Sequence, residues 1–532
     1  MKFEFHCTKR RYLKTKVKDI ATLSVLGTVW EQKELDSVLS NNDDVSVLIN
    51  KIKSFSGFFS IVYQKKDDLF ASVDHIRSHP LFYGQKDGKL FLCDEAGWVK
   101  EQVGDNTIEQ VARDEFQLTG YVTGKDTLCP NVKQLQAGEC LSIIDGKLSL
   151  YRYYTFKHSE PKKYVENELV INLDKISKGS IARLIEYACG RQIVIPLSGG
   201  FDSRLIATLL KKTRYPNIIC FTYGINGNKD AIYSKIVAEA LELPWYFVEY
   251  TKQLWKEAYN TEEAKEYEKL AFNYVSLPHF QDWLAVKKLK EKNIIARDAV
   301  FVPGHTGDMI AGSHLPKYIY EDIDGVRNKL EALNEILRRH YCLAPYQEIK
   351  TKKEIFVKRV LDSLRESTIT STKDFADACE YWNWQERQAK FICNSIRVYE
   401  FFGYDWWIPL WDKPFVKFFE NLPLQLRNHD WYKTYVDLIF KDISCSKSQK
   451  LNNIGIGKKK ISLSQKMSVK NEIVKKVINN VFRLFTQNSL NALEGRYDEK
   501  IYNSMIRKGY KSNGIFAHFV LREIEESKLF LY

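Results

Sequence analysis

The hexapeptide Ser198-Gly199-Gly200-Phe201-Asp202-Ser203 carries the residue types best suited to holding phosphate. Its adjacent glycines let the backbone turn tightly and approach a ligand with no Cβ in the way. Its Ser and Asp side chains offer hydroxyl and carboxylate groups at the start of a helix, where backbone N–H groups attract anions. A plain helix N-cap uses the same residue types, but the full pattern between an apolar strand and a helix is more specific. The segment therefore predicts a phosphate and metal site, and the absence of GxxxxGK[ST] excludes an ordinary Walker loop.

A second carboxylate follows another expected strand further along the chain. The run 299–302 is apolar and ends in Pro303-Gly304-His305-Thr306-Gly307-Asp308. Taken alone, Asp308 could simply cap a helix. Two carboxylates at the ends of parallel strands can instead share one Mg²⁺, which takes few protein ligands and completes its shell with water and phosphate oxygens. We expect Asp202 and Asp308 to be its ligands.

Alternating strands and helices position these two loops. Strands are expected at 193–197, 218–223 and 245–250, with helices at 204–211 and 231–241. This alternation is typical of a doubly wound parallel sheet covered by helices. Ligands of such sheets lie at the carboxyl ends of the strands, which is where both loops are expected.

The remaining chain divides into a β-rich start and a helical end. Up to about Tyr154, short apolar runs separated by turn signals such as Asp145-Gly146 predict a layered β-sheet domain. Beyond Gly325 the pattern is mostly helical, and basic amphipathic stretches such as 470–485 follow Lys458. The expected fold class is α/β plus α+β, with domains at 1–158 and 165–458 and a basic helical C-terminal extension at 459–532.

Length, charge and cysteine usage narrow the class of protein. A chain of 532 residues is too long to form a single hydrophobic core, so two or three domains are expected. The net charge of +13 favours polyanions, but it is spread along the chain and selects no partner. No stretch approaches the roughly 18 apolar residues of a membrane span. The ten cysteines are scattered without a CxxC pair, which predicts a cytoplasmic protein with reduced thiols and neither a zinc site nor a disulfide frame.

The hexapeptide resembles the PP-loop of ATP pyrophosphatases, which cleave ATP between the α and β phosphates and transfer AMP. With the glycine-rich turn that ends in Asp308, the chain resembles asparagine synthetases and their relatives. The segment Ile408-Pro409-Leu410-Trp411-Asp412 is similar to the PFLD segment of that family, and Lys433 lies in an expected helix after Leu422-Pro423. His305 stands where asparagine synthetases usually carry an acidic residue, so the acid-base step or the bound substrate is expected to differ from theirs.

The N-terminal region resembles the glutaminase domain of the same family. The likeness rests on Gly57-Phe58-Phe59-Ser60, on Asp74 with the segment 77–83, and on Ala137-Gly138-Glu139. Glutaminase chemistry of this kind needs a cysteine whose own free α-amine acts as base. Here Lys2 follows Met1, and the nearest thiol, Cys7, falls inside an expected strand. We therefore expect no glutaminase activity, and free ammonia or an amine becomes the expected nucleophile.

The family resemblance implies roles for particular residues. ATP and its pyrophosphate would be bound by Leu197, Ser198, Gly199, Gly200, Asp202, Ser203, Thr222, Tyr223 and Gly304. A lysine near the α-phosphate would stabilise the charge that develops there, with Lys450 preferred over Lys447, and His305 is the third catalytic candidate.

Candidate substrate ligands lie further along the chain. Glu386, Arg387 and Arg397 could orient a polar or acidic substrate, with surface pairing as the alternative. They are interleaved with a tryptophan cluster that would form either core or substrate floor, comprising Trp382, Trp384, Trp406, Trp407 and Trp411.

These features predict a ligase that uses ATP and Mg²⁺ to adenylate a small-molecule, sugar-acid or peptide carboxylate, which ammonia or an amine then attacks. An intramolecular cyclase of the β-lactam synthetase or peptide cyclase type stays open, as does a catalytically silent nucleotide-binding regulatory protein. A PP-loop RNA-modifying enzyme is less favoured, because neither a catalytic Cys pair nor an RNA-binding module is evident. We expect no nucleic acid partner and no membrane span, and a homodimer stays open.

Overall fold

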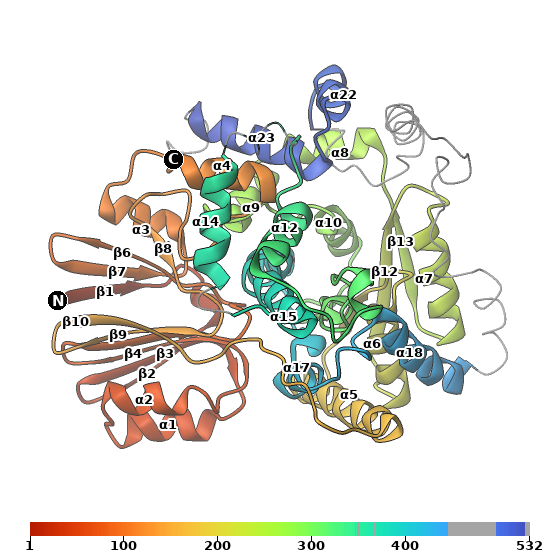
Figure 1. Cartoon of the computed structure of the whole chain (residues 1–532), viewed down its shortest axis with the longest axis horizontal. Helices are drawn as coiled ribbons and strands as arrows, with labels where there is room; N and C mark the ends of the chain where they lie inside the picture. The colour runs from red at the N-terminus through yellow and green to blue at the C-terminus, as the bar shows by residue number, and fades with distance from the viewer. Residues whose placement is uncertain (346, 348–349, 351, 365–367, 445–495, 527–532) are drawn as a thin grey trace.

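The computed structural model describes residues 1–345, 347, 350, 352–364, 368–444 and 496–526. Three sheets organise the chain (Figure 1): two in the N-terminal part and one, all parallel, further along. Helices of the later sequence lie between them. The molecule is therefore a mixed α/β protein built from several sheets, as the sequence predicts.

Two antiparallel-rich sheets form the N-terminal part, in the orders β10-β9-β5-β4-β3-β2 and β1-β7-β6-β8. The strands are β1 (Lys2–His6), β2 (Leu13–Lys18), β3 (Ala21–Val29), β4 (Gly57–Lys65), β5 (Asp68–Val73), β6 (Phe82–Lys86), β7 (Lys89–Cys93), β8 (Lys133–Gln134), β9 (Glu139–Ile144) and β10 (Lys147–Arg152). Val62 and Leu141 of the first sheet share one apolar core with Leu90 and Leu92 of the second. The two sheets thus pack face to face, because both present alternating apolar side chains to the same interior.

Helices that the sequence reading missed cover the outer faces of these sheets. α1 (Gln32–Ser40) and α2 (Val45–Lys51) pack on the six-stranded sheet, and α3 (Ala96–Val103) packs on the four-stranded one. In α1 the buried residues Leu35, Val38 and Leu39 have helical spacing. That spacing was the available signal, but a helix of two or three turns leaves few positions to reveal it.

The parallel sheet has the strand order β13-β12-β11-β14-β15. Its strands are β11 (Ile193–Pro196), β12 (Ile218–Gly224), β13 (Trp245–Glu249), β14 (Val300–Phe301) and β15 (Asp405–Trp406). From β11 the chain first builds outward through β12 and β13, and it later returns to the other side of β11 with β14. The strand order therefore reverses between β11 and β14, which makes this edge a topological switch point.

Helices connect and surround the parallel sheet. They are α5 (Glu166–Ala188), α6 (Phe201–Lys212), α7 (Lys229–Ala240), α8 (Lys252–Tyr259), α9 (Glu262–Phe272), α10 (Trp283–Glu291), α11 (Gly307–Ile310), α12 (Lys329–His340), α14 (Lys353–Leu364), α15 (Thr372–Trp382), α16 (Arg397–Phe401), α17 (Lys413–Glu420) and α18 (His429–Ser444). A π-helix, η3 (Asn383–Ile392), continues α15 directly. Short 3₁₀ turns are η1 (Arg10–Tyr12), η2 (Lys317–Tyr320), η4 (Cys393–Ile396) and η5 (Pro409–Trp411).

The described part of the expected C-terminal extension packs onto earlier elements. It comprises α22 (Glu499–Lys508) and α23 (Ser512–Glu525), and Figure 1 shows α23 lying along α4 (Gln110–Thr119). The Gln117 side chain donates a hydrogen bond to the Gly514 carbonyl at 2.8 Å. The helix expected at 470–485 lies outside the described residues. Over the described ranges, no helix is both long and apolar enough to cross a membrane.

Candidate nucleotide and metal site

The PP-loop runs from the end of β11 into α6, and its own hydroxyls organise it. The Ser198 N–H donates to Ser203 Oγ at 3.2 Å, and the Gly200 N–H donates to Ser198 Oγ at 3.1 Å. A Cβ on Gly199 would stand 2.8 Å from Cβ of Tyr233, so this position requires glycine. Because α6 begins at Phe201, the N–H groups of its first turn lack helical partners and face the loop. The loop therefore offers a concentrated set of donors for phosphate oxygens.

The glycine-rich turn after β14 lies directly against the PP-loop. The Asp308 N–H donates to Asp202 Oδ2 at 3.0 Å. A Cβ on Gly304 would stand 2.6 Å from the Ser203 nitrogen, so the two backbones meet without an intervening side chain. The contact follows from topology, because β11 and β14 are neighbours at the switch point. The structure thus brings the two predicted metal ligands together.

The electrostatics of this pair suit a divalent cation. Burial, and then the charge of Asp308, raise the pKa of Asp202 to about 8. Among the described residues, no Lys or Arg forms an ion pair with either carboxylate. His314 Nε2 lies 3.7 Å from Asp308 Oδ2, but burial lowers the pKa of His314 to about 4, so this imidazole is neutral at pH 7.

The donor set also indicates which kind of ion fits. The described residues contain no group of three or more His, Cys, Asp or Glu side chains that could hold a metal alone. Two carboxylates without a compensating cation fit Mg²⁺, which draws its remaining ligands from water and phosphate oxygens. Asp202 and Asp308 would hold the ion only together with a bound nucleotide.

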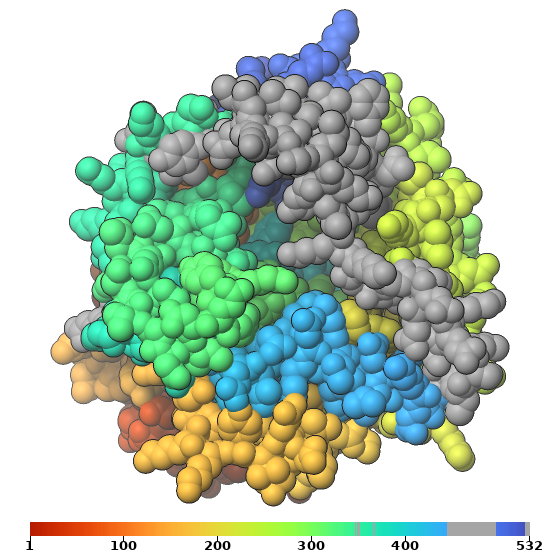
Figure 2. All heavy atoms as spheres, turned by 45° about the vertical axis from the view of Figure 1, so that its right-hand side comes forward, coloured from red at the N-terminus to blue at the C-terminus, as the bar shows by residue number. Residues whose placement is uncertain are grey.

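A cavity of about 290 Å³ opens beside the PP-loop, near the lower end of the range for small-molecule sites. Its lining comprises Pro196, Ser198, Ser203, Tyr223, His279, Gln281, Asp282, Pro303, Gly304, His305, Ser395 and Tyr399. The sequence had indicated Ser198, Ser203, Tyr223, Gly304 and His305. Figure 2 shows the face around it hollowed, with blue α18 below the hollow and the green segment that follows the glycine-rich turn at its left.

Sequence reasoning missed the far wall of this cavity. There the Tyr399 hydroxyl donates to Asp282 Oδ2 at 2.7 Å, and burial raises the pKa of Asp282 to about 6. Asp282 precedes α10, where it would read as a helix cap, but its side chain makes no capping bond. Its link to Tyr399 joins distant segments, so no local pattern could have revealed it.

Thr222 and Leu197, both predicted ligands, turn their side chains away from the cavity. The Thr222 hydroxyl donates to the Leu197 carbonyl and lies 2.7 Å from Ser234 Oγ. Both residues are buried behind the strand ends. Neither residue lines the cavity.

His305, a predicted catalytic residue, lines the cavity as a neutral imidazole. Its Nε2 lies 3.1 Å from Ser395 Oγ. Burial lowers the pKa of His305 to about 3, and its buried Nδ1 has no hydrogen-bond partner among the described residues. The ring can therefore position a ligand by hydrogen bonding, but it carries no positive charge near pH 7.

The lysines predicted for the α-phosphate, Lys447 and Lys450, lie outside the described residues. Another lysine stands close to the PP-loop. The Nζ atom of Lys433, on α18, lies 5.5 Å from the centroid of the Phe201 ring. Lys433 is paired with the exposed carboxylate of Asp430 at 3.2 Å, an arrangement that leaves it able to turn toward an anion.

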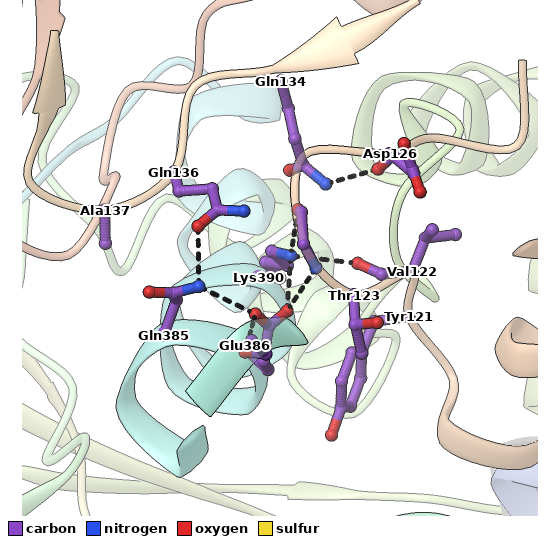
Figure 3. Close-up of polar contacts among 12 residues, drawn as sticks. Tyr121, Val122, Thr123, Asp126, Gln134, Gln136, Ala137, Gln385, Glu386 and Lys390 are labelled. Carbon is purple, nitrogen blue, oxygen red and sulfur yellow. Dashed lines mark hydrogen bonds and ion pairs between the residues drawn. The ribbon is translucent and has the colours of Figure 1, made fainter. Parts of the chain in front are cut away.

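The three predicted substrate ligands have different surroundings. Glu386 is fully buried, pairs with Lys390 at 2.5 Å and accepts from the Gly124 N–H at 2.9 Å (Figure 3). Arg397 is buried as well, where it pairs with Glu400 and donates to the Ser78 carbonyl. Both are therefore occupied by contacts inside the protein. Arg387 is half-buried and forms no hydrogen bond or ion pair with any described residue.

The tryptophan cluster belongs to the packed interior. Each of its five members, Trp382, Trp384, Trp406, Trp407 and Trp411, is buried. The Trp384 indole donates to the His75 carbonyl at 2.8 Å, which joins the cluster to the N-terminal part. The interior position agrees with the ordinary behaviour of large aromatic side chains and gives no substrate floor.

Cys7 lies just after β1, one position beyond the strand in which it was expected. The residue is buried, and burial together with the nearby Asp94 carboxylate raises the pKa of its thiol to about 12. Asp94 accepts hydrogen bonds from the Thr8 and Lys9 N–H groups at 2.7 and 3.1 Å, which fixes its charge beside this thiol. Such surroundings oppose formation of the thiolate.

Comparisons with known proteins agree with this geometry. A family model described as asparagine synthase matches residues 189–442, and one described as a glutamine amidotransferase domain matches residues 49–154. The first match contains the PP-loop, the glycine-rich turn and η3. The second covers most strands of the two N-terminal sheets.

Individual relatives are more distant. The chain is 27% identical over 175 residues to the tRNA-specific 2-thiouridylase MnmA of Karelsulcia muelleri (strain GWSS), an alignment that covers 31% of this chain and 42% of the relative. The chain thus spans less than half the length of this curated relative.

Two solved structures also align, each at 12% identity and a TM-score of 0.17. Glutamine phosphoribosylpyrophosphate amidotransferase from B. subtilis, complexed with ADP and GMP, aligns over 54% of this chain and 63% of its own. An allosteric regulatory enzyme of purine biosynthesis aligns over 55% and 56%. Alignments this loose support no argument about fold or activity. On the family models and the paired loops, the chain belongs to the asparagine synthetase-related family.

Proposed function

We propose that this protein is an ATP-dependent ligase that adenylates a carboxylate and lets ammonia or an amine attack the acyl-adenylate to form an amide. The main support for this proposal is the contact between the PP-loop and the glycine-rich turn, in which the Asp308 N–H donates a hydrogen bond to Asp202 beside a ligand-sized cavity. The asparagine synthase match over residues 189–442 supports the same reaction class.

The first half-reaction transfers AMP. An oxygen of the substrate carboxylate attacks the α-phosphorus, the bond from that phosphorus to the bridging oxygen breaks, and pyrophosphate leaves. The N–H groups at the start of α6 and the Ser198 hydroxyl would hold the departing phosphates. Mg²⁺ bound by Asp202 and Asp308 would supply positive charge against the leaving pyrophosphate. Tyr223 and the turn at Gly304 would border the adenosine.

The second half-reaction forms the amide. The nitrogen nucleophile attacks the acyl carbon, AMP departs with the electrons of the acyl–oxygen bond, and the nitrogen loses a proton. His305 is placed to accept or donate a hydrogen bond at this cavity. Because burial lowers the pKa of His305 to about 3, it would act as an uncharged group, unlike the acidic residue of asparagine synthetases.

We further propose that the N-terminal amidotransferase-like region lacks glutaminase activity. Support comes from Cys7, whose thiol is buried and has a pKa raised to about 12 by burial and by the Asp94 carboxylate, which opposes formation of the nucleophilic thiolate. The nitrogen would then reach the site as free ammonia or as an amine on a second substrate. In this proposal, the N-terminal sheets serve as a packing partner for the helices around η3.

The test follows AMP and pyrophosphate in the full-length protein supplied with ATP, Mg²⁺, ammonium and a panel of amino, sugar and peptide acids. We expect acid-dependent AMP formation that falls at least about 100-fold in Asp202→Asn and Asp308→Asn, because the metal ligands act on the transition state. Asp324→Asn, which changes a carboxylate that is 90% exposed, is the matched control and should keep full activity. ADP in place of AMP would exclude this chemistry.

The same samples are assayed for glutamate released from glutamine. We expect none above a blank without protein. Release that disappears in Cys7→Ala would show that the thiol is catalytic after all and would overturn the second proposal.

A further inference from the structure

The segment that leads into α10 forms one wall of the nucleotide cavity, and two tyrosine hydroxyls hold it in place. Tyr250, just after β13, donates to the Gln281 carbonyl at 2.7 Å and accepts from the Ala285 N–H at 3.1 Å. Tyr399 of α16 donates to Asp282 Oδ2 at 2.7 Å. Because these hydroxyls come from separate elements, the position of Asp282 at the cavity is fixed by the fold.

Asp282 is the charged side chain of this cavity. Of the other lining residues, His279 and His305 have pKa values that burial lowers to about 4 and about 3, so both rings are neutral at pH 7. The remaining lining side chains are those of serine, tyrosine, glutamine and proline. The wall therefore carries a single negative charge, which favours a cationic ligand group over an anionic one.

The described residues supply no cation to balance Asp282, which is 8% exposed and forms no ion pair with any of them. The titratable groups on which its charge acts are four buried phenols with raised pKa values, those of Tyr223, Tyr250, Tyr267 and Tyr399. Burial raises the pKa of Asp282 to about 6, so the carboxylate is ionised at pH 7. A buried carboxylate with neutral neighbours is costly unless a ligand brings positive charge.

The same cavity is bordered by the two phosphate-binding loops. Ser198 and Ser203 of the PP-loop and Gly304 of the glycine-rich turn line it together with Asp282. In the proposed reaction these loops hold the acyl-adenylate, so a nitrogen bound at Asp282 would share the cavity with the acyl group. The Asp282 charge would repel phosphate oxygens, and it is therefore better suited to the nucleophile than to the nucleotide.

We propose that Asp282 binds the nitrogen nucleophile in its cationic form, as ammonium or as the ammonium group of a second substrate, and accepts its proton. The inference rests on the proposed adenylation and names the residue that serves its second half-reaction. A carboxylate suits this role because it accepts charged hydrogen bonds from an ammonium group, and because a base that is half-protonated close to neutral pH transfers protons efficiently.

The proposed step balances as follows for an amine R–NH₃⁺. One proton passes from nitrogen to the Asp282 carboxylate, and the freed lone pair forms a bond to the acyl carbon. The bond from that carbon to the AMP oxygen breaks, and its electron pair leaves with AMP. The second proton on nitrogen passes to the departing phosphate. The products are the amide, AMP and a neutral Asp282, which returns its proton to water.

The test measures the two half-reactions separately in the full-length protein, with an acid that yields AMP and with ammonium or ethylamine as nucleophile. Asp282→Asn removes the charge and keeps an acceptor for the Tyr399 hydroxyl. We expect amide formation to fall about 100- to 10,000-fold, while acid-dependent exchange of pyrophosphate into ATP is unchanged. Hydroxylamine, which is mostly uncharged at pH 7, should lose much less, because its lone pair is already free.

Glu420→Gln is the matched control. Glu420 is 2% exposed and accepts from the Tyr154 hydroxyl at 2.6 Å, but it does not line the cavity. This variant should keep both half-reactions. If it slows amide formation as much as Asp282→Asn does, the loss of any buried charge would explain the effect, and the proposal would fail.

Other outcomes separate this inference from the proposed function. If Asp282→Asn slows pyrophosphate exchange as much as amide formation, the carboxylate serves the nucleotide or the acid, and the inference is overturned while adenylation stands. Unchanged amide formation would overturn it as well. A wild type that uses ammonium but not ethylamine, with the loss in the variant, identifies ammonia as the nucleophile, and the use of both identifies an amine.

A binding experiment covers the case in which no acid yields AMP and the proposed adenylation itself fails. Ligand-observed NMR then follows ethylammonium with the wild type in the presence of a non-hydrolysable ATP analogue. Binding that is lost in Asp282→Asn and kept in Glu420→Gln supports the cation site. Absence of binding to the wild type refutes it.

Discussion

At the residue scale, Asp202 both joins the two loops and lies next to a second carboxylate, an arrangement that a bound cation would stabilise. It helps to join the loops by accepting the Asp308 N–H, and it also lies beside the Asp308 carboxylate. Burial and that neighbouring charge raise the pKa of Asp202 to about 8. A site that prefers the neutral carboxyl when empty and the carboxylate when loaded couples metal binding to proton release.

This coupling predicts how the stability of the metal-free protein depends on pH. A carboxyl whose folded-state pKa lies above its unfolded value stabilises the protein less as the pH rises from about 4 to about 8, because ionisation is easier in the unfolded chain. Asp202→Asn avoids ionisation. We expect this variant to exceed the wild type by about 1 to 3 kcal/mol in free energy of unfolding at pH 9, and to match it near pH 4.

Denaturant unfolding with a chelator present measures this difference. Adding Mg²⁺ and ATP should stabilise the wild type most at high pH and should stabilise Asp202→Asn far less. A variant advantage that is the same at pH 4 and pH 9 would contradict the assignment, because it could not arise from ionisation of this carboxyl.

At the scale of elements, the site depends on the switch point between β11 and β14 and on η3 beside it. The two loops lie about a hundred residues apart along the chain, yet they meet because their strands, β11 and β14, are neighbours in a parallel sheet. The π-helix supplies Gln388 to one loop and Glu386 and Lys390 to the N-terminal region. π-Helical segments often occur at functional sites, since their wider turn redirects side chains.

The buried Glu386–Lys390 pair gives a prediction for this element. Lys390→Met removes one partner and leaves the Glu386 charge buried, so it should lower the free energy of unfolding by about 3 to 5 kcal/mol. The double variant Glu386→Gln with Lys390→Met should recover a large share of that loss, because no charge is left without a partner. The urea midpoint of the first unfolding transition measures both.

Lys373→Met provides the comparison for the loss of a lysine. Its side chain is 39% exposed, and it pairs with an aspartate that is 90% exposed. This change should cost less than about 1 kcal/mol. Equal effects of the two lysine substitutions would show that the buried Glu386–Lys390 pair does not stabilise the contact between η3 and the N-terminal region.

At the scale of the whole molecule, the last described helix, α23, packs against the N-terminal part of the chain. α23 packs against α4 of the N-terminal part, and Arg496, just before α22, pairs with Glu268 of α9 at 2.7 Å. Ile515, Phe516 and Val520 of α23 are buried. Segments from the N-terminal part, the middle and the end of the described chain therefore share this region, so its packing contributes to stability.

Phe516→Ala tests this long-range packing. The Phe516 ring is 3% exposed and lies 6.0 Å from the Phe280 ring, so its removal leaves a cavity. We expect a loss of about 3 to 5 kcal/mol in the free energy of unfolding. His518→Ala on the exposed side of the same helix should change stability by less than about 0.5 kcal/mol. Comparable losses in the two variants would mean that the helix contributes little through its buried face.

The sequence by itself determined the features that depend on neighbouring residues. The glycines and hydroxyls of the PP-loop, the alternation of strands and helices from β11 to β13, and the layered N-terminal sheets all follow from local composition and period. Ser198, Ser203, Tyr223, Gly304 and His305 line the cavity, as the sequence had indicated, because each stands at the carboxyl end of a strand or in the loop and first helical turn after it. The short helix α1 escaped notice because its apolar spacing covers too few turns.

Tertiary structure alone decided what depends on contacts between distant segments. Asp282 lines the cavity through its bond with Tyr399, which no local pattern encodes. Glu386, Arg387 and Arg397 are all candidate substrate ligands in the sequence, yet Glu386 and Arg397 form buried ion pairs, whereas Arg387 is half-buried and forms no ion pair with a described residue. Whether such a side chain is paired depends on which groups the fold brings within hydrogen-bonding distance, because a buried charge is stable only when a group of opposite charge lies next to it.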